Sequence, residues 1–227
     1  MTSDEKKLDN PVWFSLSETH KNFGIDCDTI KFYHPDYCPF GGFIKLENTA
    51  NPIAEYAKLA DSFYIVGKKP MLPNHLKLKA ELICHQMIIY EKIDGNSNDE
   101  ILKLGEQHLD DLLELVKIVY PEYFKKKTHT LGNYYGIYKD NQLVAVTGER
   151  MQMNNFIEVS AVITHPDHIG KGYAKQLVAH TVNAIFDQNK TPFLHVAESN
   201  IGAIKLYEKL GFQTRKKISI WNIINNK

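Results

Sequence analysis

The sequence predicts a mixed α/β protein with a mostly antiparallel sheet, preceded by a smaller α/β unit. Three observations support this fold class. The chain of 227 residues is 43% hydrophobic and 24% charged, which supplies enough apolar side chains for a globular core. After residue 100, stretches that alternate apolar and polar residues interleave with stretches of helical spacing. Residues 94–100 hold no apolar side chain and are rich in turn formers, so they predict a linker.

The linker divides the chain into an N-terminal domain, residues 1–95, and a C-terminal domain, residues 100–227. In the first domain, Asn10 followed by Pro11 predicts a short helix with a capped start. The other elements expected there are a helix at 50–60 and strands at 62–66 and 78–90. This domain carries no catalytic signature, so its own residues assign it no role.

The second domain is more regular. Apolar residues from Leu109 to Val119 recur at helical spacing and stop before Pro121, which predicts a helix. A polar turn at 139–142 joins two alternating stretches and predicts a hairpin. The elements expected in order are strand 102–105, helix 108–120, strands 134–138, 143–148 and 156–164, helix 170–188, strand 193–196, helix 200–210 and strand 212–221.

The charge balance disfavours nucleic acid as a partner. Lys and Arg together number 27, Asp and Glu also number 27, and the net charge is zero. A duplex-binding protein is expected to carry a basic stripe, and only Arg150 and Arg215 could give forked phosphate contacts. The three cysteines, Cys27, Cys38 and Cys84, lack metal-type spacing, so no metal site is expected.

The first ten residues are charged and lack the apolar stretch of a signal peptide. No apolar run approaches the roughly 20 residues that a membrane helix requires. The sequence therefore predicts a cytoplasmic protein without a membrane partner.

A glycine loop between a predicted strand and the longest predicted helix carries the chemical signal. Gly170 and Gly172 allow backbone N–H groups to turn toward one point, and the helix that follows adds unpaired donors and a positive dipole end. These features favour a phosphate group, and Lys171 and Lys175 add positive charge. The plainer alternative is a simple turn before a helix.

Two well-known phosphate loops do not fit this segment. The Walker pattern requires a glycine where His165 stands and a Ser or Thr where Gly172 stands. The dinucleotide fingerprint requires a third glycine at the position of Lys175.

A second motif follows about 25 residues later, with Asn200, Tyr207, Gly211 and Phe212. Together the two segments resemble the GNAT superfamily of acetyl-CoA-dependent N-acetyltransferases, over roughly residues 100–222. The family loop has Gln or Arg, two residues, Gly, one residue, then Gly or Ala, and the corresponding positions here are Ile169, Gly172 and Ala174. The departure at Ile169 removes one side-chain contact near the pyrophosphate, whereas the backbone cradle is kept.

A fainter resemblance extends over most of the chain. The Pro-Asp-His element before the glycines and the Gly-Glu-Arg150 segment are similar to those of a bacterial subgroup of the family. Members of that subgroup carry an extra N-terminal domain that begins with a segment like residues 10–13. The resemblance says nothing about the substrate.

The resemblance implies a GNAT-type sheet in which acetyl-CoA, as a co-substrate, lies between two strands that splay apart. Its expected cofactor-binding residues are Val162, Ile163, Thr164, Gly170, Lys171, Gly172, Tyr173, Ala174, Lys175 and Asn200. For Asn200 the alternative role is a helix N-cap, and both roles are compatible.

The resemblance also implies that Tyr207 is the general acid. A phenol of pKa about 10 can return a proton to a thiolate whose conjugate acid has a pKa of about 8.5. The alternative for Tyr207 is a buried helical tyrosine. For the base, Glu158 occupies the strand before the loop, where relatives that acetylate histones carry a glutamate. Glu149, His195 and a water chain are rivals.

The expected activity is transfer of an acetyl group from acetyl-CoA to a primary amine of a small molecule or a peptide. The alternative is a non-catalytic acyl-CoA-binding regulatory protein, which Ile169 favours and Tyr207 opposes. The N-terminal half is expected to complete the acceptor pocket or to form a homodimer contact.

Overall fold

The strands form one continuous sheet that runs through both halves of the chain. The computed structural model describes residues 4–27, 29–95, 97–119 and 124–225. Its 11-stranded sheet has the order β1-β2-β3-β4-β11-β5-β10-β9-β8-β7-β6. Neighbouring strands are antiparallel except for the pairs β3–β4 and β9–β10. The predicted fold class, a mixed and mostly antiparallel α/β sheet of GNAT type, is confirmed.

The bounds of the strands follow the predicted pattern more closely in the second half than in the first. They are β1 Gly24–Cys27, β2 Ile30–Tyr33, β3 Phe40–Phe43, β4 Ser62–Val66, β5 Leu76–Ile88, β6 Leu102–Leu104, β7 Tyr134–Lys139, β8 Gln142–Gln152, β9 Phe156–Thr164, β10 Thr191–Ala197 and β11 Gln213–Asn225. The sequence did not predict β1, β2 or β3, because strands of four residues, one of them with two central glycines, are too short for an alternating pattern.

The described α-helices are α1 Pro11–Ser17, α2 Ala50–Tyr56, α3 Leu109–Val119, α4 Tyr173–Phe186 and α5 Ile201–Lys209. Short 3-10 turns are η1 Asp4–Asp9, η2 Lys21–Phe23, η3 Glu106–His108, η4 Thr128–Leu131 and η5 Pro166–His168. Asn10 caps α1 by accepting a hydrogen bond from the Trp13 amide, as predicted. The predicted end of the third helix at Tyr120 and Pro121 lies outside the described residues.

The long strand β5 crosses the predicted domain boundary. It pairs with β11 from Leu76 to Ile88 and with β10 from Cys84 to Ile88. A strand of the first half therefore lies between two strands of the second half. The division at residues 95–100 stays a prediction, and strand pairing is continuous across it.

Helices and the N-terminal turn cover opposite faces of this sheet. Apolar side chains of β9 and β10, such as Val159 and Leu194, pack against Val182 of α4 and Ile204 of α5. On the other face, Phe193 belongs to a core shared with α1, β3 and η1; its N-terminal members include Leu8, Val12, Leu16 and Phe40. Strand alternation separates the two cores, because successive side chains point to opposite faces.

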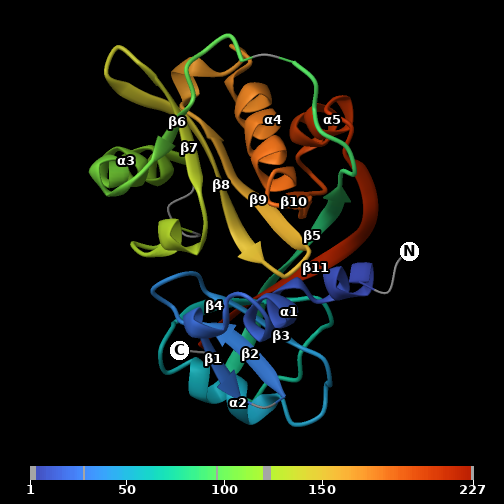
Figure 1. Cartoon of the computed structure of the whole chain (residues 1–227). Coiled ribbons are helices and arrows are strands. Elements are labelled where there is room, and N and C mark those ends of the chain that lie inside the picture. The colour runs from blue at the N-terminus through green and yellow to red at the C-terminus, as the bar shows by residue number, and fades with distance from the viewer. Residues whose placement is uncertain (1–3, 28, 96, 120–123, 226–227) are drawn as a thin grey trace.

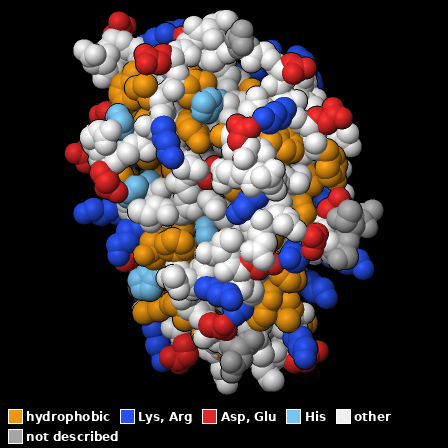
Figure 2. Space-filling view, viewed as in Figure 1, with side chains coloured by type: hydrophobic (Ala, Val, Ile, Leu, Met, Phe, Trp, Pro, Cys, Tyr) orange, Lys and Arg blue, Asp and Glu red, His pale blue; other side chains and the backbone are white. Residues whose placement is uncertain are grey.

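In Figure 1 the elements α3, α4 and α5 lie in the upper part and β1 to β4 in the lower part, with β5 and β11 running through both. The N-terminal turn and α1 lie where the two parts meet. On the face shown in Figure 2, basic and acidic side chains are interspersed. Within the described residues, no helix is long and apolar enough to span a bilayer.

Candidate active site

The parallel strands β9 and β10 separate after a short ladder. Their parallel ladder joins Thr191, Pro192 and Phe193 to residues 156–158 and, within the described residues, has no further pairs. Strand β9 nevertheless continues to Thr164, where β8 still pairs with its other edge. Residues 159–164 thus present an edge toward β10 that has no ladder partner there. An open backbone edge of this kind can receive an extended ligand with amide groups.

A bulge marks the middle of the open edge. Ala161 has a φ of +50°, and the register between β8 and β9 shifts beside it. Of the three residues expected to bind the pantetheine arm, Val162 packs against the core of α4 and α5, Ile163 against the core beside α3, and Thr164 pairs with Ala145. The side chains of Val162 and Ile163 serve packing, so their backbone groups are what these two residues can offer a ligand.

The glycine loop lies between the end of β9 and the start of α4. Gly170 and Gly172 have φ of +84° and +82°, in the left-handed region. A Cβ at either position would meet no atom within 4 Å, so conformation rather than crowding selects glycine. The sequence pattern predicted that this helix begins at residue 170. These torsions explain why α4 begins at Tyr173 instead.

The loop offers backbone donors at an uncapped helix start. Gly172 is the N-cap of α4, and no side chain bonds to the first turn. Ile169, at the position where the family has Gln or Arg, is 71% exposed. The start of α4 thus lacks a side-chain cap, and the positive end of the helix dipole lies there, which favours an anion.

Of the remaining loop residues, one is packed in the core and two are exposed to solvent. Tyr173 is buried against Leu177, and Lys139 lies over its ring at 5.8 Å from the centroid. Lys171 and Lys175 are exposed, and the Lys171 Nζ lies 3.3 Å from the His168 Nδ1. The two lysines can add positive charge beside the loop, whereas Tyr173 contributes its backbone.

Helix α5 brings the second motif to the same face of the sheet. The Asn200 side chain accepts a hydrogen bond from the Ala203 amide at 3.1 Å, so the N-cap role is confirmed. Tyr207 is 7% exposed, packs with Val196 of β10, and meets the Phe212 ring edge-on at 5.8 Å between centroids. Both residues lie next to β10, one of the two splaying strands.

Glu158 lies at the last pair of the β9–β10 ladder and is 1% exposed. Arg150 donates to both of its oxygens at 2.7 Å, and the His195 Nδ1 is 2.7 Å from Oε1. Burial by itself would raise the pKa of Glu158, but the Arg150 charge and these hydrogen bonds lower it well below its usual range. A carboxylate held in this way is a weak proton acceptor.

The two rival candidates for the base, His195 and Glu149, also have polar contacts with other side chains. The His195 Nε2 lies 3.0 Å from the Gln86 Nε2. Glu149 is fully buried and accepts hydrogen bonds from Asn133 and Gln152. The sequence did not predict Gln86 as a partner of His195 or Asn133 as a partner of Glu149, because both lie far away in the chain. Among the described residues, no three His, Cys, Asp or Glu side chains cluster as metal ligands.

A parallel strand pair that splays beside a glycine loop and an uncapped helix start defines an acyltransferase fold of GNAT type. The FR47-like protein family model matches residues 134–221, which include β7 to β10, α5 and most of β11. No curated protein matches the chain significantly.

Solved structures extend the likeness to the N-terminal half. A GNAT-family protein from Novosphingobium aromaticivorans is 28% identical, with a TM-score of 0.87 over 97% of this chain and 99% of that chain. A GCN5-related N-acetyltransferase-like protein from Streptococcus suis has a TM-score of 0.63 and 15% identity, over 96% of this chain and 97% of that one. The GCN5-related N-acetyltransferase from Kribbella flavida has a TM-score of 0.60 and 11% identity, over 90% and 89%. The family-model match and these solved structures support the resemblance to the GNAT superfamily that the two motifs predicted.

Proposed function

We propose that this protein is an acetyl-CoA-dependent N-acetyltransferase that transfers the acetyl group to a primary amine of a small molecule or a peptide. The observation that carries the proposal is the open edge of β9, which leads directly into the glycine loop and the start of α4. An acyl-CoA has an extended chain with two amides followed by a pyrophosphate. The edge suits the amides, and the uncapped amides of the loop suit the pyrophosphate.

The residues that would hold acetyl-CoA fit its chemistry in a second respect. The positions that a Cβ would occupy at Gly170 and Gly172 are empty, so a phosphate can approach the backbone closely. The exposed Lys171 and Lys175 lie on the same loop and can offset phosphate charge. Ile169 supplies no polar contact, so we expect weaker binding than a Gln or Arg would give.

In the proposed reaction the amine lone pair attacks the thioester carbon, the C–N bond forms, and the C–S bond breaks. The departing thiolate takes a proton from the Tyr207 hydroxyl, because a thiol of pKa about 8.5 is a better leaving group once protonated. The surplus proton of the amine passes to water, and Tyr207 regains a proton from water, so that acetyl-CoA and the amine yield the amide and free CoA. Glu158 is a poor candidate for the base, since Arg150 binds both of its oxygens.

The cellular setting is part of the same proposal. The buried Cys38 and Cys84 are free thiols, as expected for a reducing cytoplasm where acetyl-CoA is available. The homodimer and the acceptor pocket that the sequence led us to expect stay predictions.

The test compares native protein with Tyr207→Phe, using acetyl-CoA, a panel of primary amines and a thiol reagent that detects free CoA. We expect amine-dependent thiol release that falls at least tenfold in the variant, with acetyl-CoA affinity unchanged, because only the proton donor is lost. Tyr90→Phe, at a 53% exposed tyrosine, is the matched control and should keep full activity. Acetyl-CoA binding without amine-stimulated release would favour the regulatory alternative, and no binding at all would refute the proposal.

A further inference from the structure

A row of polar side chains crosses the sheet beneath the splayed strands. Arg150 of β8, Glu158 of β9, His195 of β10, Gln86 of β5 and Arg215 of β11 come from five strands that are neighbours in the sheet. Each contacts the next, at 2.7, 2.7, 3.0 and 2.7 Å along the row. These side chains lie on one face and are largely buried. Burying one charged or polar side chain per strand costs folding free energy unless its polar groups have hydrogen-bonding partners.

The donor pattern of the row can be followed from one end to the other. Arg215 only donates, so it must face the carbonyl oxygen of the Gln86 side chain. The Gln86 amide nitrogen then donates to the Leu8 carbonyl oxygen at 2.7 Å and to the His195 Nε2. The imidazole therefore accepts at Nε2 and donates from Nδ1 to Glu158. A single arginine thus fixes the tautomer of a histidine two strands away.

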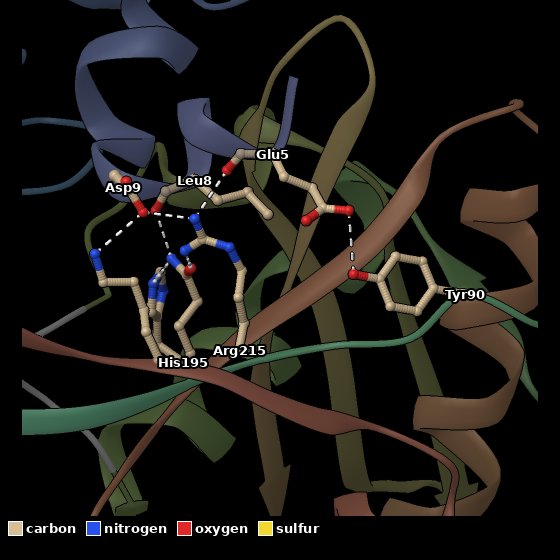
Figure 3. A network of polar contacts seen from close by, with 8 residues as sticks. Glu5, Leu8, Asp9, Tyr90, His195 and Arg215 are labelled. Carbon is tan, nitrogen blue, oxygen red and sulfur yellow. Dashed lines mark hydrogen bonds and ion pairs between the residues drawn. The ribbon is translucent and has the colours of Figure 1, made fainter. Parts of the chain in front are cut away.

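The N-terminal turn closes the outer end of the row. Arg215 donates to the Glu5 carbonyl oxygen at 3.0 Å and to the Asp9 carboxylate at 2.5 Å, and Lys216 also reaches Asp9. Figure 3 shows these contacts converging on η1, with Tyr90 bonded to Glu5 at the side. The first residues of the chain are thereby tied to the strands that splay.

The row passes through the point where the splay begins. Glu158 belongs to the last β9–β10 pair, and His195 lies two residues beyond its partner Phe193. Their hydrogen bond ties the two strands together where backbone pairing stops. Gln86 fixes His195 from the β5 side, so the separation of the strands depends on how this amide is held.

We propose that Gln86 is a positioning residue for acyl transfer: through His195 and Glu158, it sets the width of the opening between β9 and β10 that receives the acyl-CoA arm. The inference rests on the proposed function, because the arm must bond to both strand edges at once. A displacement of about 1 Å at a reacting centre can cost on the order of a hundredfold in rate.

The test uses Gln86→Met, which keeps the length of the side chain and removes its polar atoms. Two quantities are measured: the ring nitrogen resonances of His195 in the free protein, assigned with His195→Gln, and the Kd for acetyl-CoA by calorimetry. We expect the single Nδ1–H tautomer of the native protein to become a mixture, and the Kd to rise about tenfold. Tyr90→Phe removes the contact beside the row and should change neither quantity.

A second variant keeps the proposal testable if the substitution at the buried Gln86 prevents folding. Asp9→Asn loosens Arg215 from the half-exposed end, and we expect a smaller Kd increase in the same direction, roughly two- to fivefold. An unchanged Kd and an unchanged tautomer in both variants, with native binding intact, would overturn the positioning role. If the native protein itself fails to bind acetyl-CoA, the proposed function fails and this role fails with it; the two failures are told apart by the native titration.

Discussion

A carboxylate buried beside an arginine is stable only while both partners keep their charges. Glu158 and Arg150 are such a pair: the carboxylate is 1% exposed, and the guanidinium lies over the Phe40 ring at 4.7 Å from its centroid. The lowered pKa of Glu158 follows from this arrangement and opposes a role as proton acceptor. At the scale of single residues, this buried ion pair ties strand β8 to strand β9.

We predict that Glu158→Gln destabilises the fold by about 3–5 kcal/mol, because Arg150 would stay buried without a counter-charge. Chemical denaturation of native protein and variant measures the difference. Glu55→Gln removes a carboxylate from an exposed ion pair with Lys58 and is the control, with an expected change within about 0.5 kcal/mol. A fully stable Glu158→Gln protein that has lost only its turnover would instead restore Glu158 as the base.

The same pair gives stability a pH dependence in acid. Because the pKa of Glu158 is lowered by folding, its contribution is complete above the usual carboxyl value of 4.5 and is lost as the pH falls below it. In that range the unfolded chain binds a proton that the native protein does not. Denaturation curves of the native protein should therefore weaken more steeply below pH 4.5 than those of Glu158→Gln.

At the scale of elements, the junction of β9 and α4 is built for backbone recognition. The strand keeps one edge open, two glycines turn the chain in the left-handed region, and the helix begins without a side-chain cap. Each feature removes a partner that a backbone amide would otherwise have. An anionic ligand with an extended arm would satisfy all of these groups together.

We predict that Gly172→Ala raises the Kd for acetyl-CoA about tenfold or more, since a φ of +82° is strained for alanine and the new Cβ fills the space at the helix start. The strain itself should lower stability by about 1–2 kcal/mol. Calorimetric titration and thermal unfolding measure the two effects.

Gly95→Ala is the matched control for this element. Gly95 also has a positive φ, of +128°, and open space at its Cβ position, but it lies in the 94–100 segment. Its substitution should lower stability by a similar amount and leave the Kd unchanged. An equal rise in Kd for both variants would mean that the loop has no specific part in binding.

At the scale of the whole molecule, the two halves share one sheet and one of its core clusters. Strand β5 lies between β10 and β11, and the core beneath η1 and α1 includes Phe193 and Ile218 from the second half. The N-terminal residues thus cover the sheet face opposite α4 and α5. Neither half has its own complete set of strand partners.

We predict that a fragment of residues 100–227 does not unfold cooperatively, because β10 and β11 would lose the strand between them and expose shared core. Circular dichroism during heating measures this. The control is the pair of fragments 1–95 and 100–227 produced together, which should refold as one unit, since the cut falls in a largely exposed segment. A sharp transition of the 100–227 fragment alone, near that of the full chain, would support two independent domains.

The second half of the fold was predictable because its elements are long and periodic. The helix that became α4 and the strand β9 appear in the sequence pattern with their true order and nearly their true bounds. The glycine loop and the Asn200 cap were also predictable, because both depend on local chain chemistry, positive φ and a side chain that bonds three residues ahead. Such features need no knowledge of distant residues.

Only the tertiary structure decided the contacts between strands that lie far apart in the chain. Residues 86 and 195 are neighbours because β5 inserts beside β10, and no spacing in the sequence encodes that pairing. The sequence by itself determined the resemblance to the GNAT superfamily and the position of the loop, since both rest on motifs of neighbouring residues. The partners of Glu158, the place of β5 and the tie to the N-terminal turn required the folded sheet, because burial and hydrogen bonding across strands are set by packing of the whole chain.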